Sequence, residues 1–207
     1  NEFDEWWKLR DLATIRRPPA ALKLRISVAI DVRNPLLGHQ GCSRVYGPQK
    51  GLCEFDWAEK CLERMATVLR QQHGIDCANV PGAGAAGGLG FGLMAFAGAT
   101  LESGFELFAR YSNLEKHIAS ADIVVTGEGS LDSQSHMGKG VGQIAALCAR
   151  RRVPCVALAG RIVPAPEHHH AFAHTGALTR ITDPKRAQTQ AGIFLERLAA
   201  EIATRIC

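Results

Sequence analysis

One stretch of the chain passes from a short apolar strand through a helix to a second apolar strand, and this order limits the folds open to it. Residues 123–125 (IVV) are β-branched, residues 138–151 show helical periodicity, and residues 154–159 (PCVALA) are again apolar. Two strands joined through a helix run parallel, because the crossover returns the chain to the same edge of the sheet. The sequence therefore predicts an α/β fold with a Rossmann-like parallel sheet in its C-terminal part.

The N-terminal part has its own strand and helix pattern. The chain begins with a connecting arm, in which Pro18 and Pro19 prevent a helix. Residues 24–30 (LRISVAI) then predict a strand that delivers Asp31 at its carboxyl end. A helix is predicted from an N-cap at Asp56 to a C-cap at Gly74, and further helix starts are predicted at Ser103, Ser112 and Asp183. We expect two α/β portions, residues 1–112 and 113–207.

Composition and charge exclude several classes of protein. With 46% hydrophobic residues among 207, the chain is not disordered. Its net charge of +4 forms no basic stripe, so we expect no nucleic-acid partner. Seven cysteines without a C-x-x-C pair indicate reduced thiols and a cytoplasmic protein. Residues 77–101 carry no charge, but Pro81 and several glycines interrupt them, so we expect no membrane span.

The strongest candidate site is the segment TGEGSLD, residues 126–132, directly after the predicted strand 123–125. In parallel sheets, ligands bind outside the carboxyl ends of the strands. Two glycines would let the backbone approach a phosphate, and two acids would offer oxygen ligands to Mg²⁺: Gly127, Gly129, Glu128 and Asp132. Lys139 could hold a phosphate at the start of the next helix. The alternative is a sharp turn whose two acids are merely solvated.

A second candidate is DVRNPLLG, residues 31–38, where an acid follows a strand. In phosphoryl transfer, Asp31 could take a proton from a hydroxyl and Arg33 could restrain an anionic reactant. The alternative is an ordinary junction between a strand and a turn, in which Asn34 and Pro35 form the turn.

A third candidate is the glycine-rich segment PGAGAAGGLG, residues 81–90. It contains G-x-G-x-x-G, but no convincing strand precedes it, so a dinucleotide-binding oxidoreductase is only a lesser alternative. Two interpretations stay open for this segment. Its backbone N–H groups could receive nucleotide phosphates or a substrate carboxylate, or its glycines could serve tight helix packing.

Four segments in this order resemble the type I glycerate kinase family: AIDVRNPLLG, YGPQKG, PGAGAAGGLGFGL and VVTGEGSLDSQSHMGK. The resemblance implies a kinase that uses ATP and Mg²⁺ to phosphorylate a hydroxyl of D-glycerate. It also implies a glycerate kinase-like fold. Residues 1–112 would then be part of an inserted α/β domain with the glycine-rich loop, and residues 113–207 the C-terminal half of a Rossmann-like domain.

The same resemblance implies roles for single residues. Asp31 would accept the hydroxyl proton, with Asn34 as a substrate or metal contact nearby. Asp132 and Lys139 would also act in catalysis, and Glu128 and Asp132 would hold Mg²⁺. Further contacts to substrate or nucleotide would come from Lys50, Gly82, Gly84, Gly87, Gly88 and Gln134, beside Arg33, Gly127 and Gly129, which the residues alone already nominate.

The chain also departs from the family pattern. Family members are nearly twice as long and carry DSFKGSL-like and GDGGEGT-like motifs, neither of which occurs here. We therefore expect a fragment that lacks an N-terminal segment, a truncated homologue, or one half of a split protein. Among partners, a second copy of the chain in a homo-oligomer also stays open. The alternative function is a non-catalytic module, derived from this fold, that binds phosphate or carboxylate.

Overall fold

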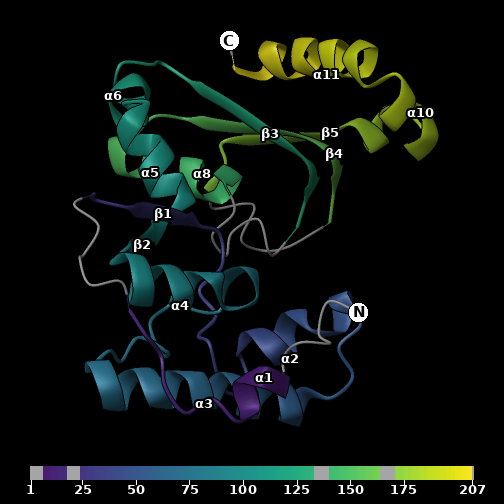
Figure 1. The fold of residues 1–207 in the computed structure, drawn as a ribbon. Coiled ribbons are helices and arrows are strands. Elements are labelled where there is room, and N and C mark those ends of the chain that lie inside the picture. The colour runs from purple at the N-terminus through teal and green to yellow at the C-terminus, as the bar shows by residue number, and fades with distance from the viewer. Residues whose placement is uncertain (1–6, 18–23, 133–139, 164–170, 207) are drawn as a thin grey trace. The chain divides into compact units, whose positions relative to one another are not determined.

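The computed structural model describes residues 7–17, 24–132, 140–163 and 171–206. It divides the chain into unit 1, Asn1–Leu107, and unit 2, Phe108–Cys207, whereas the sequence predicted a division after residue 112 (Figure 1). Each unit combines helices with parallel strands, which confirms the predicted α/β class. The correspondence of each unit to a domain of the family stays a prediction.

Unit 1 contains a two-stranded parallel sheet, in which β1 (Ser27–Ile30) pairs with β2 (Thr100–Ser103). The strand β1 is shorter than predicted. The helices of this unit are α1 (Trp7–Arg10), α2 (Cys42–Tyr46), η1 (Pro48–Lys50), α3 (Phe55–His73), α4 (Ala85–Ala97) and α5 (Gly104–Tyr111), within which the division falls. Leu36, Leu69 and Phe91 are fully buried and form the core between α3, α4 and the segment after β1.

The helix α3 ends where the sequence predicted but begins earlier. Gly74 adopts a left-handed conformation with φ of 67° and closes the helix by donating to the Arg70 carbonyl oxygen. The N-cap prediction for Asp56 was wrong, because the helix begins at Phe55. Asp56 lies in the first turn instead, where the helix dipole favours an acid, and it pairs with Arg44 at 2.6 Å.

The described part of the predicted connecting arm lies along α3. The Arg64 Nε atom donates to the Leu12 carbonyl oxygen at 2.7 Å, and Gln72 Nε2 donates to that of Ala13 at 2.9 Å. Leu12 and Ala13 are therefore held against α3 by side chains of this helix.

Unit 2 contains a parallel sheet with the strand order β3 (Val124–Leu131), β4 (Cys155–Ile162), β5 (His174–Ala177). Its helices are α6 (Leu114–Ala119), α8 (Gly140–Arg151), η2 (Leu178–Arg180), α10 (Pro184–Thr189) and α11 (Ala191–Ile206). The helix α8 joins β3 to β4, which confirms the predicted strand–helix–strand unit. Figure 1 shows α8 and α11 on opposite sides of this sheet. The arrangement is Rossmann-like, with both faces of a parallel sheet covered.

The predicted helix starts had different outcomes. Ser103 caps α5 by accepting the Glu106 N–H, at 3.4 Å, and Asp183 caps α10 by accepting the Arg186 N–H, at 3.0 Å. The prediction for Ser112 was wrong, because α6 begins after Asn113 and the Ser112 hydroxyl donates back to the preceding turn.

None of the described helices is long and apolar enough to cross a membrane. The uncharged stretch 77–101 folds into turns followed by α4, which has 13 residues. That helix is shorter than the roughly 20 residues that a membrane span needs.

Candidate functional site

The carboxyl ends of β1 and β2 bring Asp31 next to the start of α5. Ile30 pairs with Ser103 at the end of the two strands, so Asp31 and Gly104 are the residues that follow at one edge. A Cβ atom on Gly104 would lie 2.8 Å from Oδ1 of Asp31. The exposed Asp31 carboxylate therefore lies at the N-terminus of α5, where the helix dipole favours a negative charge.

The side chain of Asn34 is fixed by hydrogen bonds on both sides. The Tyr46 hydroxyl donates to Asn34 Oδ1 at 2.6 Å, and Asn34 Nδ2 donates to the Gln40 carbonyl oxygen at 2.8 Å. The carbonyl oxygen of Asn34 accepts the Gly84 N–H at 2.9 Å. Burial raises the pKa of Tyr46, so its hydroxyl stays protonated and able to donate. Asn34 thus links the segments DVRNPLLG, YGPQKG and PGAGAAGGLG.

Two glycines of the third segment are needed for close packing. A Cβ atom on Gly84 would lie 2.2 Å from the Pro35 carbonyl oxygen, and one on Gly82 would lie 2.2 Å from Cδ1 of Ile30. Both distances are shorter than any normal contact. The packing interpretation therefore explains Gly82 and Gly84, and no strand is found among the described residues that lead into this segment.

The next part of the same segment is an exposed left-handed turn. Ala86, Gly87 and Gly88 have φ values of 50°, 70° and 100°, and a Cβ atom on Gly87 would have no neighbour within 4 Å. A side chain would have space at Gly87, so close packing does not explain why this residue is glycine. Its left-handed backbone conformation explains it, because glycine adopts such φ values without strain.

The close approach at Gly84 gives a testable prediction. Gly84→Ala should lower the free energy of unfolding of unit 1 by about 2 kcal/mol. The added methyl group would overlap backbone atoms of Pro35, which cannot shift without displacing the chain. Gly92→Ala, a matched control within α4 with open space at its Cβ, should raise it by about 0.5–1 kcal/mol. Urea unfolding followed by tryptophan fluorescence measures both, because Trp6, Trp7 and Trp57 all belong to unit 1. Equal stability of Gly84→Ala and the unsubstituted chain would contradict the predicted contact.

Two predicted cationic contacts lie in unit 1. Arg33 follows β1 and Lys50 ends η1, and both are exposed. Among the described residues, neither side chain has a recorded hydrogen-bond or ion-pair partner. Their exposure is compatible with the predicted contact to an anionic ligand.

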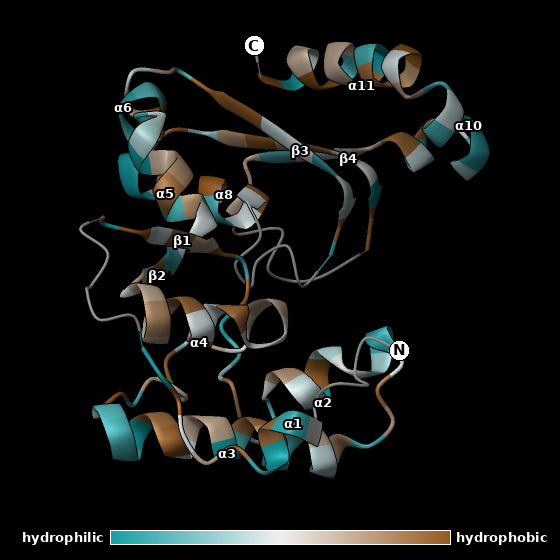
Figure 2. Ribbon diagram, viewed as in Figure 1, coloured by the Kyte–Doolittle hydropathy of each residue, from teal (hydrophilic) through white to brown (hydrophobic). Residues whose placement is uncertain are grey.

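The sequence predicted that the segment TGEGSL in unit 2 follows a strand, and this was wrong, because the segment belongs to the strand β3. Residues 126–131 are the second part of β3, whose pairing continues to Leu131 opposite Ile162 of β4. The backbones approach closely here, since a Cβ atom on Gly127 would lie 2.4 Å from the Leu158 carbonyl oxygen. Gly127 therefore serves strand pairing, whereas a Cβ atom on Gly129 would meet no neighbour. Figure 2 shows the start of β3 as hydrophobic and its later part as more polar.

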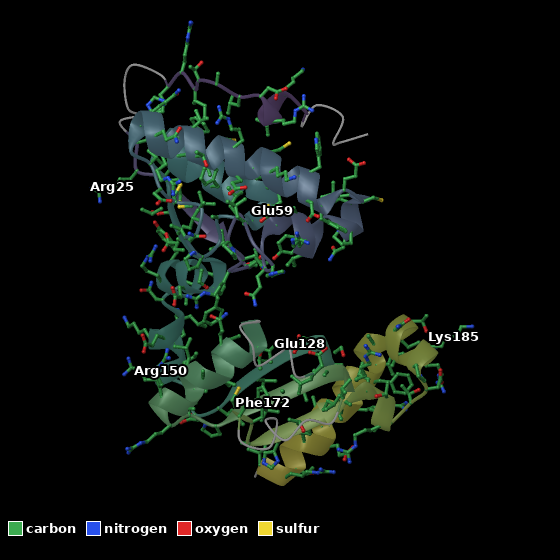
Figure 3. All side chains as sticks on the ribbon, turned by 90° about the horizontal axis from the view of Figure 1, so that it is seen from below. Arg25, Glu59, Glu128, Arg150, Phe172 and Lys185 are labelled. Atoms are coloured by element: carbon green, nitrogen blue, oxygen red, sulfur yellow. The ribbon has the colours of Figure 1, made fainter. Side chains whose placement is uncertain are left out.

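The first residue after β3 is Asp132, which places it at the carboxyl edge of the sheet. Glu128 lies four residues earlier, inside the strand (Figure 3). Four residues of a strand span about 13 Å, so the two carboxylates are not neighbours. The sequence prediction, which placed both acids in one short segment after the strand, did not show this separation.

The carboxylate of Glu128 has an unusual environment. Its Oε1 atom is buried and lacks a hydrogen-bond partner in the part of the chain that is described. Glu128 pairs with Ala159 and shares a sheet face with Cys155, whose thiol interacts with Cys148 of α8. A buried acceptor without a donor costs about 1–3 kcal/mol, so this atom is a candidate for contact with a ligand, a cation or a proton.

One cation near the same edge was not predicted from the sequence. Arg161, near the end of β4, pairs with Ser130 in the strand register, and its Nε atom donates to the Ser130 hydroxyl at 3.0 Å. The position of Arg161 could have been predicted from the parallel strands 123–125 and 154–159. Residues that follow two neighbouring parallel strands lie at the same edge of the sheet. The predicted site residues Gln134 and Lys139 lie outside the described residues.

The profile of the glycerate kinase family matches residues 5–207. The chain belongs to this family. The match confirms the resemblance that the four segments indicated, and it extends that resemblance over nearly the whole chain.

Individual relatives agree with this assignment. The chain is 37% identical over 204 residues to a glycerate kinase of Halalkalibacterium halodurans, covering 95% of this chain and 54% of that protein. It is 45% identical over 139 residues to the glycerate 2-kinase of Escherichia coli K12, covering 66% and 36%. A solved Salmonella typhimurium LT2 structure, provisionally assigned as glycerate kinase 2, has a TM-score of 0.68 at 35% identity. That similarity covers 83% of this chain and 46% of the other, so the chain spans about half the length of such family members.

Proposed function

We propose that this glycerate kinase family chain takes part in the ATP-dependent phosphorylation of D-glycerate. The family match over residues 5–207 is the observation that carries the proposal. The hydrogen-bonded linkage of three family segments at Asn34 supports it, because a site of this kind needs its parts held in a fixed arrangement.

In the proposed reaction a hydroxyl oxygen of glycerate forms a bond to the γ-phosphorus of ATP. The bond between that phosphorus and the bridging oxygen breaks, ADP leaves, and the hydroxyl proton passes to Asp31. The exposed position of Asp31 at a strand end, beside the N-terminus of α5, suits a carboxylate that must be ionised and accessible. Positioning and charge neutralisation supply most of the acceleration in such reactions.

Anionic groups of the two substrates would be bound by cations and backbone N–H groups. Arg33, Asn34 and Lys50 are assigned to glycerate or phosphate contacts, and the exposed turn at Gly87 and Gly88 to an anion. Packing already explains Gly82, Gly84 and Gly127, so their role is to bring backbone segments close together. Within unit 2, Gly129, Gln134, Lys139 and the newly found Arg161 are assigned to anion contacts.

The residues present fit Mg²⁺, which supplies neutralisation of phosphate charge when bound. No group of three or more His, Cys, Asp or Glu side chains that could hold a metal occurs in the described ranges. Magnesium in kinases, however, commonly uses one or two carboxylates together with water and substrate phosphates. Asp132, at the sheet edge, is assigned as the direct ligand. The buried Glu128 oxygen, about 13 Å back along the strand, would accept a hydrogen bond from a water or a ligand group.

We also place the protein in the cytoplasm. The six cysteines that the structure describes are all free, and burial raises the pKa of the Cys155 thiol to about 12. Reduced thiols of this kind are typical of proteins in a reducing compartment.

The test is a coupled assay of ADP release with D-glycerate and MgATP, run beside a thermal shift assay with each ligand. The proposal expects release of ADP that depends on both glycerate and Mg²⁺. A non-catalytic binding module is the second candidate, because the chain spans about half the length of its relatives. Thermal stabilisation by glycerate or ATP without ADP release would favour that module, and the absence of both effects would contradict both functions.

A further inference from the structure

A carboxylate outside the proposed contacts holds the segment that follows Asn34. Glu59 on α3 accepts the Gly38 N–H with Oε1 and the Ser43 O–H with Oε2. Figure 3 labels Glu59 within unit 1. Ser43 is the one polar residue recorded as buried in the described ranges, with 3% of its surface exposed. Each oxygen of one side chain therefore binds a donor from residues 38–43, and a buried hydroxyl is satisfied by the same contact.

The segment that contains these donors, residues 36–43, is tightly folded. Leu36 is fully buried, and its carbonyl oxygen accepts the Cys42 N–H at 3.3 Å. A Cβ atom on Gly41 would lie 2.6 Å from the carbonyl carbon of Leu37. Burial and the negative charge of Glu59 raise the pKa of Cys42 to about 11, so its thiol stays neutral within this fold.

The contacts form a closed ring that includes Asn34. The chain leads from Asn34 through Gly38 and Ser43 to Tyr46, whose hydroxyl returns to Asn34 at 2.6 Å. Glu59 attaches this ring to α3 at two points, Gly38 and Ser43. The Gly84 N–H joins the ring at the Asn34 carbonyl oxygen. Any movement of the ring would therefore displace Asn34 and the glycine-rich segment together.

We infer that Glu59 is a positioning residue that sets the geometry of the proposed glycerate contacts through Gly38 and Ser43. This inference rests on the proposed function. Glu59 bonds to the ring that presents Asn34, and that ring begins directly after Asp31 and Arg33. A carboxylate suits this role, because two acceptor oxygens at a fixed spacing hold two donors of one loop.

The test compares Glu59→Ala with Glu59→Gln and with Glu63→Ala, a control that removes an exposed acid from the same helix. Calorimetric titration gives the Kd of D-glycerate at a temperature where every variant is folded. Hydrogen exchange at the Gly38 amide reports directly on the bond to Glu59. Glu59→Gln keeps an acceptor for Gly38 and a polar partner for Ser43, so it should restore what Glu59→Ala loses.

We expect Glu59→Ala to raise the Kd of glycerate about tenfold and to speed exchange at Gly38, because bonds to a charged acceptor are lost. Glu59→Gln and Glu63→Ala should stay within about threefold of the unsubstituted chain. If Glu59→Ala does not fold, Ser43→Ala removes one of the two bonds and should give a smaller rise in Kd. A merely structural role would lower the melting temperature and leave the Kd of the folded protein unchanged.

The outcomes separate this inference from the proposed function. The role of Glu59 is overturned if Glu59→Ala binds glycerate as tightly as the unsubstituted chain does. Where Glu59→Ala is unfolded, equal affinity in Ser43→Ala has the same meaning. Either result leaves the proposed function standing. Absence of glycerate binding in the unsubstituted chain overturns the proposed function, and the inference falls with it.

Discussion

Asp31→Asn should lower the rate of glycerate phosphorylation by about a hundredfold to ten-thousandfold, the range that a positioned proton acceptor contributes. Asparagine has nearly the same size as aspartate but cannot accept the hydroxyl proton at neutral pH. Because Asp31 is exposed, the substitution should leave the unfolding of unit 1 almost unchanged. The measurement is steady-state ADP release over a range of glycerate concentrations, so that kcat and KM are separated.

Two variants make this prediction specific. Asp76→Asn removes an exposed acid elsewhere in unit 1 and should leave kcat unchanged. Gly104→Ala keeps the Asp31 carboxylate but adds a methyl group 2.8 Å from its Oδ1 atom, so the carboxylate must shift. Its kcat should fall as well, in the direction of Asp31→Asn. Full turnover in Asp31→Asn would remove Asp31 as the proton acceptor, whatever the result for Gly104→Ala.

Secondary structure was most predictable where one local signal decided it. Gly74 ends α3 because a left-handed residue is needed there, and Asp183 starts α10 because its side chain accepts a backbone N–H. The extent of β3 was less predictable. Gly127 and Gly129 favour a turn when the segment is considered alone, but pairing with β4 extends the strand to Leu131. Strand pairing is a tertiary interaction, and local propensity does not include it.

The candidate site shows the same division between local and tertiary information. Asp31 could be nominated from sequence because an acid after a predicted strand lies at the edge where ligands bind. Glu59 could not, because it occupies an ordinary position within a helix, 21 residues after its partner Gly38. Tyr46 lay within a recognised segment, yet its bond to Asn34 depends on the fold of the residues between them. Contacts of this kind need the three-dimensional structure.

Asp132→Asn should lower the rate of phosphorylation by about a hundredfold to a thousandfold, the loss expected when several kcal/mol of metal-assisted charge stabilisation disappear. Asp132 is partly exposed at the carboxyl edge of unit 2, and urea unfolding of the variant checks that its stability is kept. The loss should depend on Mg²⁺, because an amide oxygen is a weaker ligand than a carboxylate. The measurement is ADP release titrated with Mg²⁺, in which the variant needs a higher concentration for its half-maximal rate.

The control for this variant lies at the other end of the same strand. Asp122→Asn removes an exposed acid just before β3, at the amino edge of the sheet, and should change neither the rate nor the Mg²⁺ dependence. Glu128→Gln tests the alternative that the metal lies deeper along the strand. If Glu128→Gln shifts the Mg²⁺ dependence and Asp132→Asn does not, the direct ligand is Glu128 and the assignment to Asp132 is wrong. The separation of about 13 Å along β3 makes a single ion held directly by both carboxylates the least expected result.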